Sequence, residues 1–370
     1  MISTDRRSLL MGTAALAAGA LAPRFAAAQS PAPLAPQPGA WRKFEMTTAL
    51  KIDAKNGQAQ AWIPLPNFTA QDWFRPEGST WSGNAKATTV KKDAKYGAEF
   101  LHVEWDPAER APVVEVVSRF STRDRAIDLA KPTNVTQLTT EERTLNLSAT
   151  ELIATDGIVK TTADRITAGK TTDIAKAEAI YQWIVENTAR NPATRGCGVG
   201  NIKNMLEIGD LTGKCADLNA LFVGLARASG LPARDVYGLR VAPSAFGYRS
   251  LGAGSANITR AQHCRAEVWL DGFGWTPVDP ADVRKVILEE PPGKLAIDNA
   301  VVVSARKALF GAWEMNWAAY NVAHDVALPG SKGPKVEFLM YPQAELAGER
   351  LDCLDPDAFA YTITSKPITA

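Results

Sequence analysis

The sequence has few of the residues that bind metals or form covalent cross-links. It contains four cysteines and three histidines among 370 residues, with neither a C-x-x-C nor an H-E-x-x-H motif. Zinc sites depend on such closely spaced ligands, so their absence argues against a zinc protein. We predict no metal and no cofactor.

An excess of charge of either sign is also absent. Removing residues 1–28, which we interpret below as a signal peptide, leaves 38 basic and 39 acidic residues. Such a chain has no basic field to attract nucleic acid and no acidic surplus to attract a cationic partner. We therefore expect no nucleic-acid partner.

Long hydrophobic runs are confined to the N-terminus. Arg6 and Arg7 precede an apolar run over 11–21, and small residues at 26–28 provide a cleavage pattern. The paired arginines favour twin-arginine export over an ordinary secretory signal. We predict a periplasmic protein, a partner of the twin-arginine machinery until cleavage, with no membrane association afterwards. That pathway carries folded proteins, so stability should not depend on disulfides.

The mature chain is long enough for two domains, and 46% of the residues are hydrophobic. A proline-rich linker without core-forming residues is predicted over 29–40, followed by a small β-sandwich-like domain over 41–125. Residues 126–370 are predicted to form the second domain, with returning strands near the C-terminus. The predicted strands cover 45–52, 58–63, 85–91, 99–105, 113–122, 335–341 and 359–363, and one predicted helix covers 173–188.

A cysteine lies where a glycine-containing loop enters an amphipathic helix. Leu218, Leu221 and Leu225 recur at helical spacing, and Gly230 provides a stop. Cys215 is therefore in the first turn, where unpaired N–H groups and the helix dipole stabilise a thiolate. Asp217 opposes this with its charge but stabilises the same helix terminus, and the sequence leaves the balance open.

His263 and Asp279 lie on two β-prone runs that flank the turn signal at 271–274. A hairpin with a tight loop there brings the two residues nearly opposite each other. The carboxylate can then fix the imidazole tautomer, so that the other ring nitrogen takes a thiol proton. Cys215, 48 residues before His263, must be brought to this pair by tertiary structure.

Four ordered blocks give the chain a resemblance to the transglutaminase-like superfamily, here an exported bacterial member. They are residues 213–217, 226–234, 263–268 and 274–280. The resemblance implies an α+β fold, with a papain-like core in which the cysteine helix packs on an antiparallel sheet, in residues 126–370. It also implies that Cys215 is the nucleophile, His263 the general base and acid, and Asp279 the orienting carboxylate. Cys264 and Arg265 depart from the small residue and aromatic that often follow the histidine.

The chemistry implied is acyl transfer at an amide through a thioester, with a peptide or protein as substrate. Water as acceptor gives a peptidase or amidase, which we favour, and an amine gives a transglutaminase. A non-catalytic protein that binds peptide or glycan on the same fold remains an alternative. So does a zinc hydrolase that uses Cys197, Cys215, His263 and Cys264.

The remaining candidates are weaker. Cys197 lies in a glycine-dense loop that is expected to border the cleft, and if Cys215 is free, at most one disulfide can form among the other three cysteines. That loop lacks the Lys-Ser/Thr of a phosphate-binding loop. His102 is interpreted as a strand residue without a partner. His324, next to Asp325, is interpreted as a structural hydrogen-bonding residue.

Overall fold

The computed structural model describes residues 30–54 and 57–368. The predicted signal peptide lies outside them. Within the described residues, no helix is both long and apolar enough to cross a membrane. The helices in this part of the chain are α1 (Thr140–Leu147), α2 (Gly157–Thr167), α3 (Asp173–Asn187), α4 (Ile202–Ile208), α5 (Cys215–Ala228), α6 (Pro280–Glu289) and α7 (Ala300–Ala308).

Helix α5 lies at the centre of the helical part of the chain and packs against most of the other helices. Its apolar residues were expected to form one stripe, but every residue from Cys215 to Ala228 is buried. Even Arg227 is buried. Its guanidinium is satisfied there, because it donates to the carbonyls of Ser148 and Ala233, each at 2.8 Å. The helix ends as predicted, with Gly230 in the left-handed region at φ +83°. The amphipathic interpretation was therefore wrong, since neighbours cover α5 on all sides.

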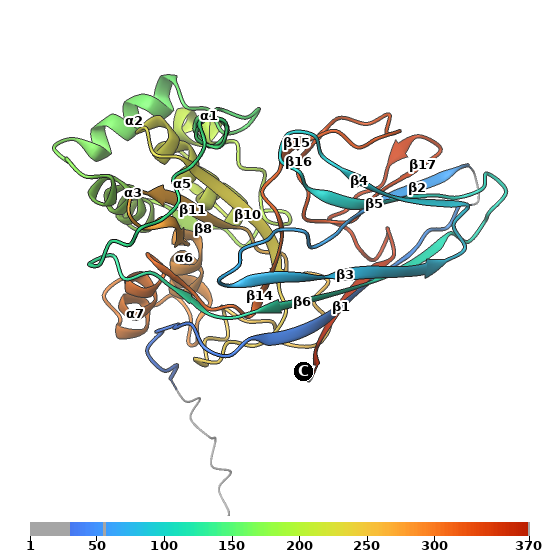
Figure 1. Ribbon diagram of the computed structural model, residues 1–370, viewed down its shortest axis with the longest axis horizontal. Coiled ribbons are helices and arrows are strands. Elements are labelled where there is room, and N and C mark those ends of the chain that lie inside the picture. The colour runs from blue at the N-terminus through green and yellow to red at the C-terminus, as the bar shows by residue number, and fades with distance from the viewer. Residues whose placement is uncertain (1–29, 55–56, 369–370) are drawn as a thin grey trace, which may run out of the picture. The chain divides into compact units, whose positions relative to one another are not determined.

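An antiparallel sheet in the order β12-β11-β10-β14 packs against α5 (Figure 1). Its strands are β10 (Ala233–Arg240), β11 (Arg265–Leu270), β12 (Gly274–Val278) and β14 (Trp317–Asn321). The predicted hairpin is β11–β12, in which Ala266 pairs with Val278 and Leu270 with Gly274. A cysteine-bearing helix packed on an antiparallel sheet is the α+β, papain-like core that the sequence predicts.

Two further antiparallel sheets form separate layers (Figure 1). One contains β1 (Arg42–Lys51), β3 (Phe74–Gly83), β6 (Val113–Thr122) and β19 (Tyr361–Ile368); the other contains β2 (Ala59–Pro64), β4 (Ala87–Lys92), β5 (Glu99–Glu104), β17 (Gln343–Leu346) and β18 (Glu349–Arg350). Alternate residues of β1 and β6 are buried, as expected for strands with one face on a core. Strand β3 was not predicted, because Pro76 and Gly78 interrupt its pattern and produce a bulge.

C-terminal strands complete both of these sheets. Strand β19 pairs with β1 over its whole length, and β17 pairs with β2. The pairing therefore crosses the predicted boundary between residues 125 and 126. Short pairs elsewhere are β7 (Arg125–Ala126) with β13 (Ala312–Trp313), β8 (Ala189–Arg190) with β9 (Thr212–Gly213), and β15 (His324–Val326) with β16 (Val336–Phe338).

The segment over 31–40 has no regular structure, but it does contribute to the core. Leu34 is 5% exposed and belongs to the main hydrophobic cluster. Its N–H donates to Ser304 Oγ at 2.8 Å, and the Ala32 N–H donates to the Phe246 carbonyl at 2.9 Å. The expectation of a linker without core-forming residues was wrong, because an apolar side chain between prolines packs against the folded part.

Candidate active site

Cys215 is the first residue of α5, as the sequence predicts, and it lines a cavity of about 510 Å³. The residue is 4% exposed. The next N–H, of Ala216, donates to the Cys197 carbonyl at 2.9 Å. No described residue accepts a hydrogen bond from the Cys215 N–H itself, so this donor is available to a substrate oxyanion.

Asp217 organises the loop in front of the helix. Its Oδ1 accepts from the N–H groups of Val199 and Gly200, and its Oδ2 accepts from the Lys214 N–H, each at 3.0 Å. Burial raises the pKa of Asp217, against the opposing effect of these donors. Asp217 therefore holds the glycine-dense loop against the N-terminus of α5, a role that was not predicted from the sequence.

His263 and Asp279 are joined across the hairpin as predicted. His263 lies two residues before the start of β11, and Asp279 follows β12 directly as the N-cap of α6. His263 Nε2 lies 2.8 Å from Asp279 Oδ2. The Trp317 indole donates to the His263 carbonyl at 2.8 Å, which fixes the backbone beside the ring. Because Nε2 faces the carboxylate, Nδ1 is left for the thiol proton.

A second carboxylate contacts the same imidazole nitrogen. Asp282 Oδ2 lies 3.3 Å from His263 Nε2, and the Arg240 guanidinium binds both oxygens of Asp282 at 2.6 and 2.7 Å. All three side chains are buried. Asp282 and Arg240 were not predicted from the sequence. One signal for Asp282 was present, because it lies three residues after Asp279 in the first turn of α6 and so near the same helix face.

Asn219 links the cysteine helix to the hairpin. It lies four residues after Cys215 on α5, and its amide donates to the Cys264 carbonyl at 2.8 Å and to Asp279 Oδ1 at 3.2 Å. Asp279 Oδ1 also caps α6 by accepting from the Asp282 N–H at 3.0 Å. Asn219 was not predicted from the sequence either. The available signal was an amide four residues after the cysteine, on the same face of a mostly apolar helix.

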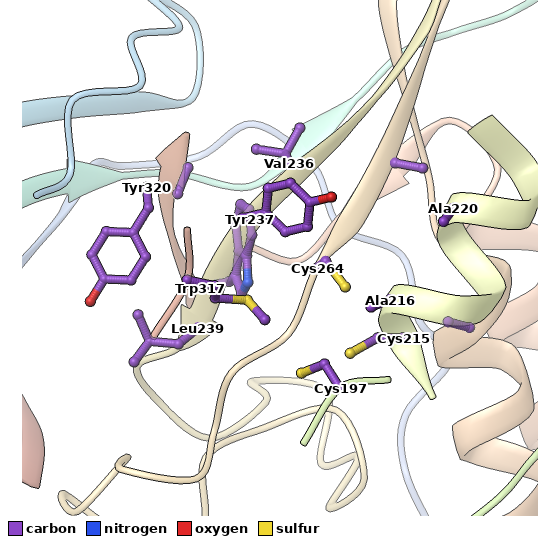
Figure 2. Packing of buried hydrophobic residues seen from close by; sticks show 14 of the residues in the cluster. Cys197, Cys215, Ala216, Ala220, Val236, Tyr237, Leu239, Cys264, Trp317 and Tyr320 are labelled. Carbon is purple, nitrogen blue, oxygen red and sulfur yellow. The ribbon is translucent and has the colours of Figure 1, made fainter. Parts of the chain in front are cut away.

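Three thiols lie near the N-terminus of α5. Figure 2 shows the sulfur atoms of Cys197, Cys215 and Cys264 gathered at the start of the helix. Cys197 lines the same cavity as Cys215, as expected for its loop, and its thiol donates to the Gln262 carbonyl at 3.4 Å. All four cysteines are free, so no disulfide joins them in this structure.

The electrostatics favour a thiolate beside an imidazolium. The Cys197 and Cys264 thiols and the His263 ring lower the pKa of Cys215 well below the ordinary thiol value, against the opposing effect of burial. Burial, the largest effect on His263, lowers its pKa, but the charges of Asp282 and Asp279 outweigh it and raise the pKa to about 9. Both shifts favour the thiolate and imidazolium form of the pair over the neutral form.

Buried guanidinium groups balance the two carboxylates. Arg265, one of the residues that depart from the family pattern, places Nε 3.6 Å from Asp279 Oδ2, and its guanidinium lies over the Trp313 and Trp317 rings. Among the described residues, the potential metal ligands that gather within 4.8 Å are His263, Asp279 and Asp282. A cation bound by these three residues would lie beside the guanidinium groups of Arg240 and Arg265, which already contact the two carboxylates. The four ligands of the zinc alternative do not form such a group in the described part of the chain.

The other two histidines lie outside this cavity. His102 is in β5 as predicted, but it does have a partner, because its Nε2 lies 3.1 Å from Gln60 Oε1 and its ring stacks on Trp62. His324 has the structural hydrogen bond expected of it, with Nδ1 3.2 Å from the Tyr237 hydroxyl.

Comparison with known proteins places the chain in a family. The model of the transglutaminase-like superfamily matches residues 160–280, which include Cys215, His263 and Asp279. An uncharacterized protein of Haemophilus influenzae is 37% identical over 342 residues, which cover 88% of this chain and 91% of that protein. The chain belongs to the transglutaminase-like superfamily.

Comparison with solved structures gives one match that shares the fold. A protein of Cytophaga hutchinsonii, proposed to be a cysteine protease, has a TM-score of 0.54 at 12% identity, covering 90% of this chain and 92% of that one. The periplasmic domain of TgpA from Pseudomonas aeruginosa has a TM-score of 0.35 at 15% identity, covering 65% and 88%. The first of these shows a shared fold.

Proposed function

We propose that this protein is a cysteine hydrolase that cleaves a peptide or isopeptide bond through a thioester. The observation that carries the proposal is that Cys215 and His263 line one cavity, with Asp279 Oδ2 2.8 Å from His263 Nε2. A thiol of lowered pKa beside an imidazole of raised pKa is the pairing that nucleophilic catalysis by cysteine requires.

The steps follow from the contacts. The Cys215 thiolate adds to the amide carbonyl, and the Cys215 N–H stabilises the oxyanion. The imidazolium of His263 protonates the leaving amine as the C–N bond breaks, which leaves a thioester. Neutral His263 then removes a proton from water, the resulting hydroxide attacks the thioester, and the thiolate leaves. Asp279 keeps the ring oriented through both steps.

Hydrolysis is favoured over transfer to an amine by the character of the cavity. Its lining includes the charged side chains of Arg190, Lys214, Arg260 and Lys285. Such groups keep the space hydrated, so water competes well for the thioester. We also propose export to the periplasm, on the basis of the paired arginines and apolar run at the N-terminus.

The direct test is to trap the thioester. The protein is incubated with a peptide library, with and without a primary amine, and intact masses and products are measured. A hydrolase forms an acyl adduct on Cys215 and releases free acids in both conditions, whereas a transglutaminase gives amide products when amine is present. Cys215→Ala should abolish the adduct and Cys353→Ala should retain it.

The non-catalytic alternative predicts a different thiol reactivity. If the protein only binds its ligand, Cys215 should react with iodoacetamide at neutral pH no faster than Cys353. A thiolate at the active site should react much faster. Full labelling by an amide-mimetic electrophile in Cys215→Ala would count against the whole assignment.

A further inference from the structure

Three cationic side chains from three different elements border the cavity beside Cys215. They are Arg190 of β8, Lys214 immediately before α5, and Lys285 of α6. No aspartate or glutamate is among the residues that line this cavity in the described part of the chain. This imbalance stands out in a chain whose total charge is close to zero.

The fold explains why these cations meet. Strands β8 and β9 are parallel and pair Arg190 with Gly213, so Lys214 follows directly at the same end of the pair. On α6, Lys285 lies three residues after Asp282 and four before Glu289, which places the three on one helix face. Because Asp282 contacts His263, that face is directed toward the site.

The local carboxylates do not neutralise this group. Arg190 and Lys285 share one partner, Glu289, which forms an ion pair with Arg190 and lies 3.8 Å from Lys285 Nζ. Within the described residues, no carboxylate forms an ion pair with the Lys214 ammonium, although Asp217 accepts from the Lys214 backbone N–H. Burial and the neighbouring charges of Arg240 and Arg190 lower the pKa of Lys285, although Glu289 and Asp282 oppose them.

Three aspartates lie close in sequence to other residues of the cavity lining, but they do not line the cavity themselves. Asp357 pairs with Arg260 at 2.6 Å and Asp352 pairs with Arg195 at 2.6 Å, both at exposed positions where ion pairs are weak. Asp355 is exposed as well, and none of the three aspartates lines the cavity. The cavity is therefore cationic on the side of β8 and α6.

We propose that Arg190, Lys214 and Lys285 form an anion subsite that binds a carboxylate carried by the substrate close to the carbonyl attacked by Cys215. The inference rests on the proposed function, and it narrows the substrate to acidic peptides. The carboxylate is that of an acidic side chain or of a chain terminus, and both present the same group to the two lysines and the guanidinium.

Two small alkylating reagents test the subsite without requiring turnover. Iodoacetate and iodoacetamide differ in carrying a carboxylate or a neutral amide, and both transfer their carboxymethyl or carbamidomethyl group to the Cys215 sulfur with loss of iodide. Their rate ratio at Cys215, normalised to the ratio for a free thiol, should favour iodoacetate by about threefold or more at low salt. Raising the salt from ~0.02 M to ~0.5 M should reduce that preference.

Variants separate the subsite from the catalytic pair, since the imidazolium of His263 also attracts anions. Lys214→Met and Lys285→Met should each lower the normalised ratio about twofold. Lys170→Met, at an exposed position outside the cavity, is the matched control and should leave it unchanged. A preference that persists undiminished in both cavity variants, or that is absent from the folded wild-type protein, overturns the subsite.

Peptide substrates then identify the source of the carboxylate. Matched peptides carry Glu or Gln beside the scissile bond, each with a free or an amidated C-terminus. Faster cleavage of the Glu pair assigns a side chain, and faster cleavage of the free acids assigns a terminus. Equal cleavage of all four overturns the subsite while upholding the hydrolase. Failure of both alkylating reagents to modify Cys215 removes the hydrolase and the subsite together.

Discussion

Two histidines of this protein are buried to the same extent and lie near carboxylates, yet they differ in charge. His263 and His324 are each 4% exposed. His263 contacts Asp279 and Asp282, and its pKa is raised to about 9. His324 Nε2 lies 3.7 Å from Asp235, and its pKa is lowered well below the ordinary value.

The state of the neighbouring groups explains the contrast. Burial lowers the pKa of His324, and the charges of Arg227 and Lys95 lower it further. Burial also raises the pKa of Asp235 to about 7, so this carboxyl is only partly ionised at neutral pH. Around His263, by contrast, Asp282 stays ionised because Arg240 binds it. The lesson is that a buried histidine becomes a proton donor only where the fold keeps an ionised carboxylate beside it.

The largest expected difference between the two histidines is in catalysis. Replacing His263 by Gln removes the general base and acid, and we expect kcat/KM for peptide cleavage to fall about a thousandfold. His324→Gln should retain most of the activity, because the His324 ring contacts the Tyr237 hydroxyl and does not line the cavity. Steady-state kinetics on both purified variants provides the measurement. A comparable loss in both would remove the distinction drawn here.

The two carboxylates should respond to neutralisation with opposite sign. Asp282→Asn leaves Arg240 buried without its partner, and we expect a loss of about 3 kcal/mol in the free energy of unfolding at pH 8. Asp235→Asn should raise that free energy at pH 8, because the raised pKa of Asp235 costs stability as pH climbs from about 4 toward 7. Urea unfolding of both variants at pH 5 and pH 8 decides the matter. Destabilisation of Asp235→Asn at pH 8 would contradict the assigned environment.

The pH profile of the wild-type protein sharpens the same contrast. Activity should decline on the basic side as His263 loses its proton near pH 9. On the acidic side it should decline as the Cys215 thiolate is protonated, at a pH below the ordinary thiol range. Rates of peptide cleavage across pH 4 to 10 measure the acidic and basic sides of the activity profile. A decline in activity on the basic side near pH 6.5 would show that the pKa of His263 is not raised, which contradicts the contrast with His324.

His263 also affects the free energy of unfolding. The stability that its raised pKa contributes is fully present below the unfolded pKa of about 6.5 and is lost as pH rises through about 9.

The smallest expected effect concerns the thiols around Cys215. Cys197→Ala removes a neighbouring thiol that lowers the pKa of Cys215, and it should raise that pKa by about half a unit. Cys353→Ala is the control, because the effects on the Cys215 pKa come from Cys197, Cys264 and His263. The pH dependence of iodoacetamide alkylation reports the shift. An unchanged midpoint would show that His263 and the helix terminus are sufficient.

Much of the site could be predicted because its parts are local in sequence. The hairpin brings His263 to Asp279 through pairing of neighbouring strands, and the spacing of leucines places Cys215 at a helix start. The resemblance to the transglutaminase-like superfamily added the relation between these two parts. The catalytic roles themselves stay predictions that the experiments above test.

The remaining features depend on contacts that no local pattern contains. Arg240 reaches Asp282 across 42 residues, Asn219 reaches Asp279 across 60, and β19 pairs with β1 from the far end of the chain. The amino-acid sequence alone determined where a helix begins and where a hairpin turns, because hydrogen bonds between near neighbours set both. Only the tertiary structure decided which buried charges meet, because a guanidinium and a carboxylate select each other by packing and not by their separation along the chain.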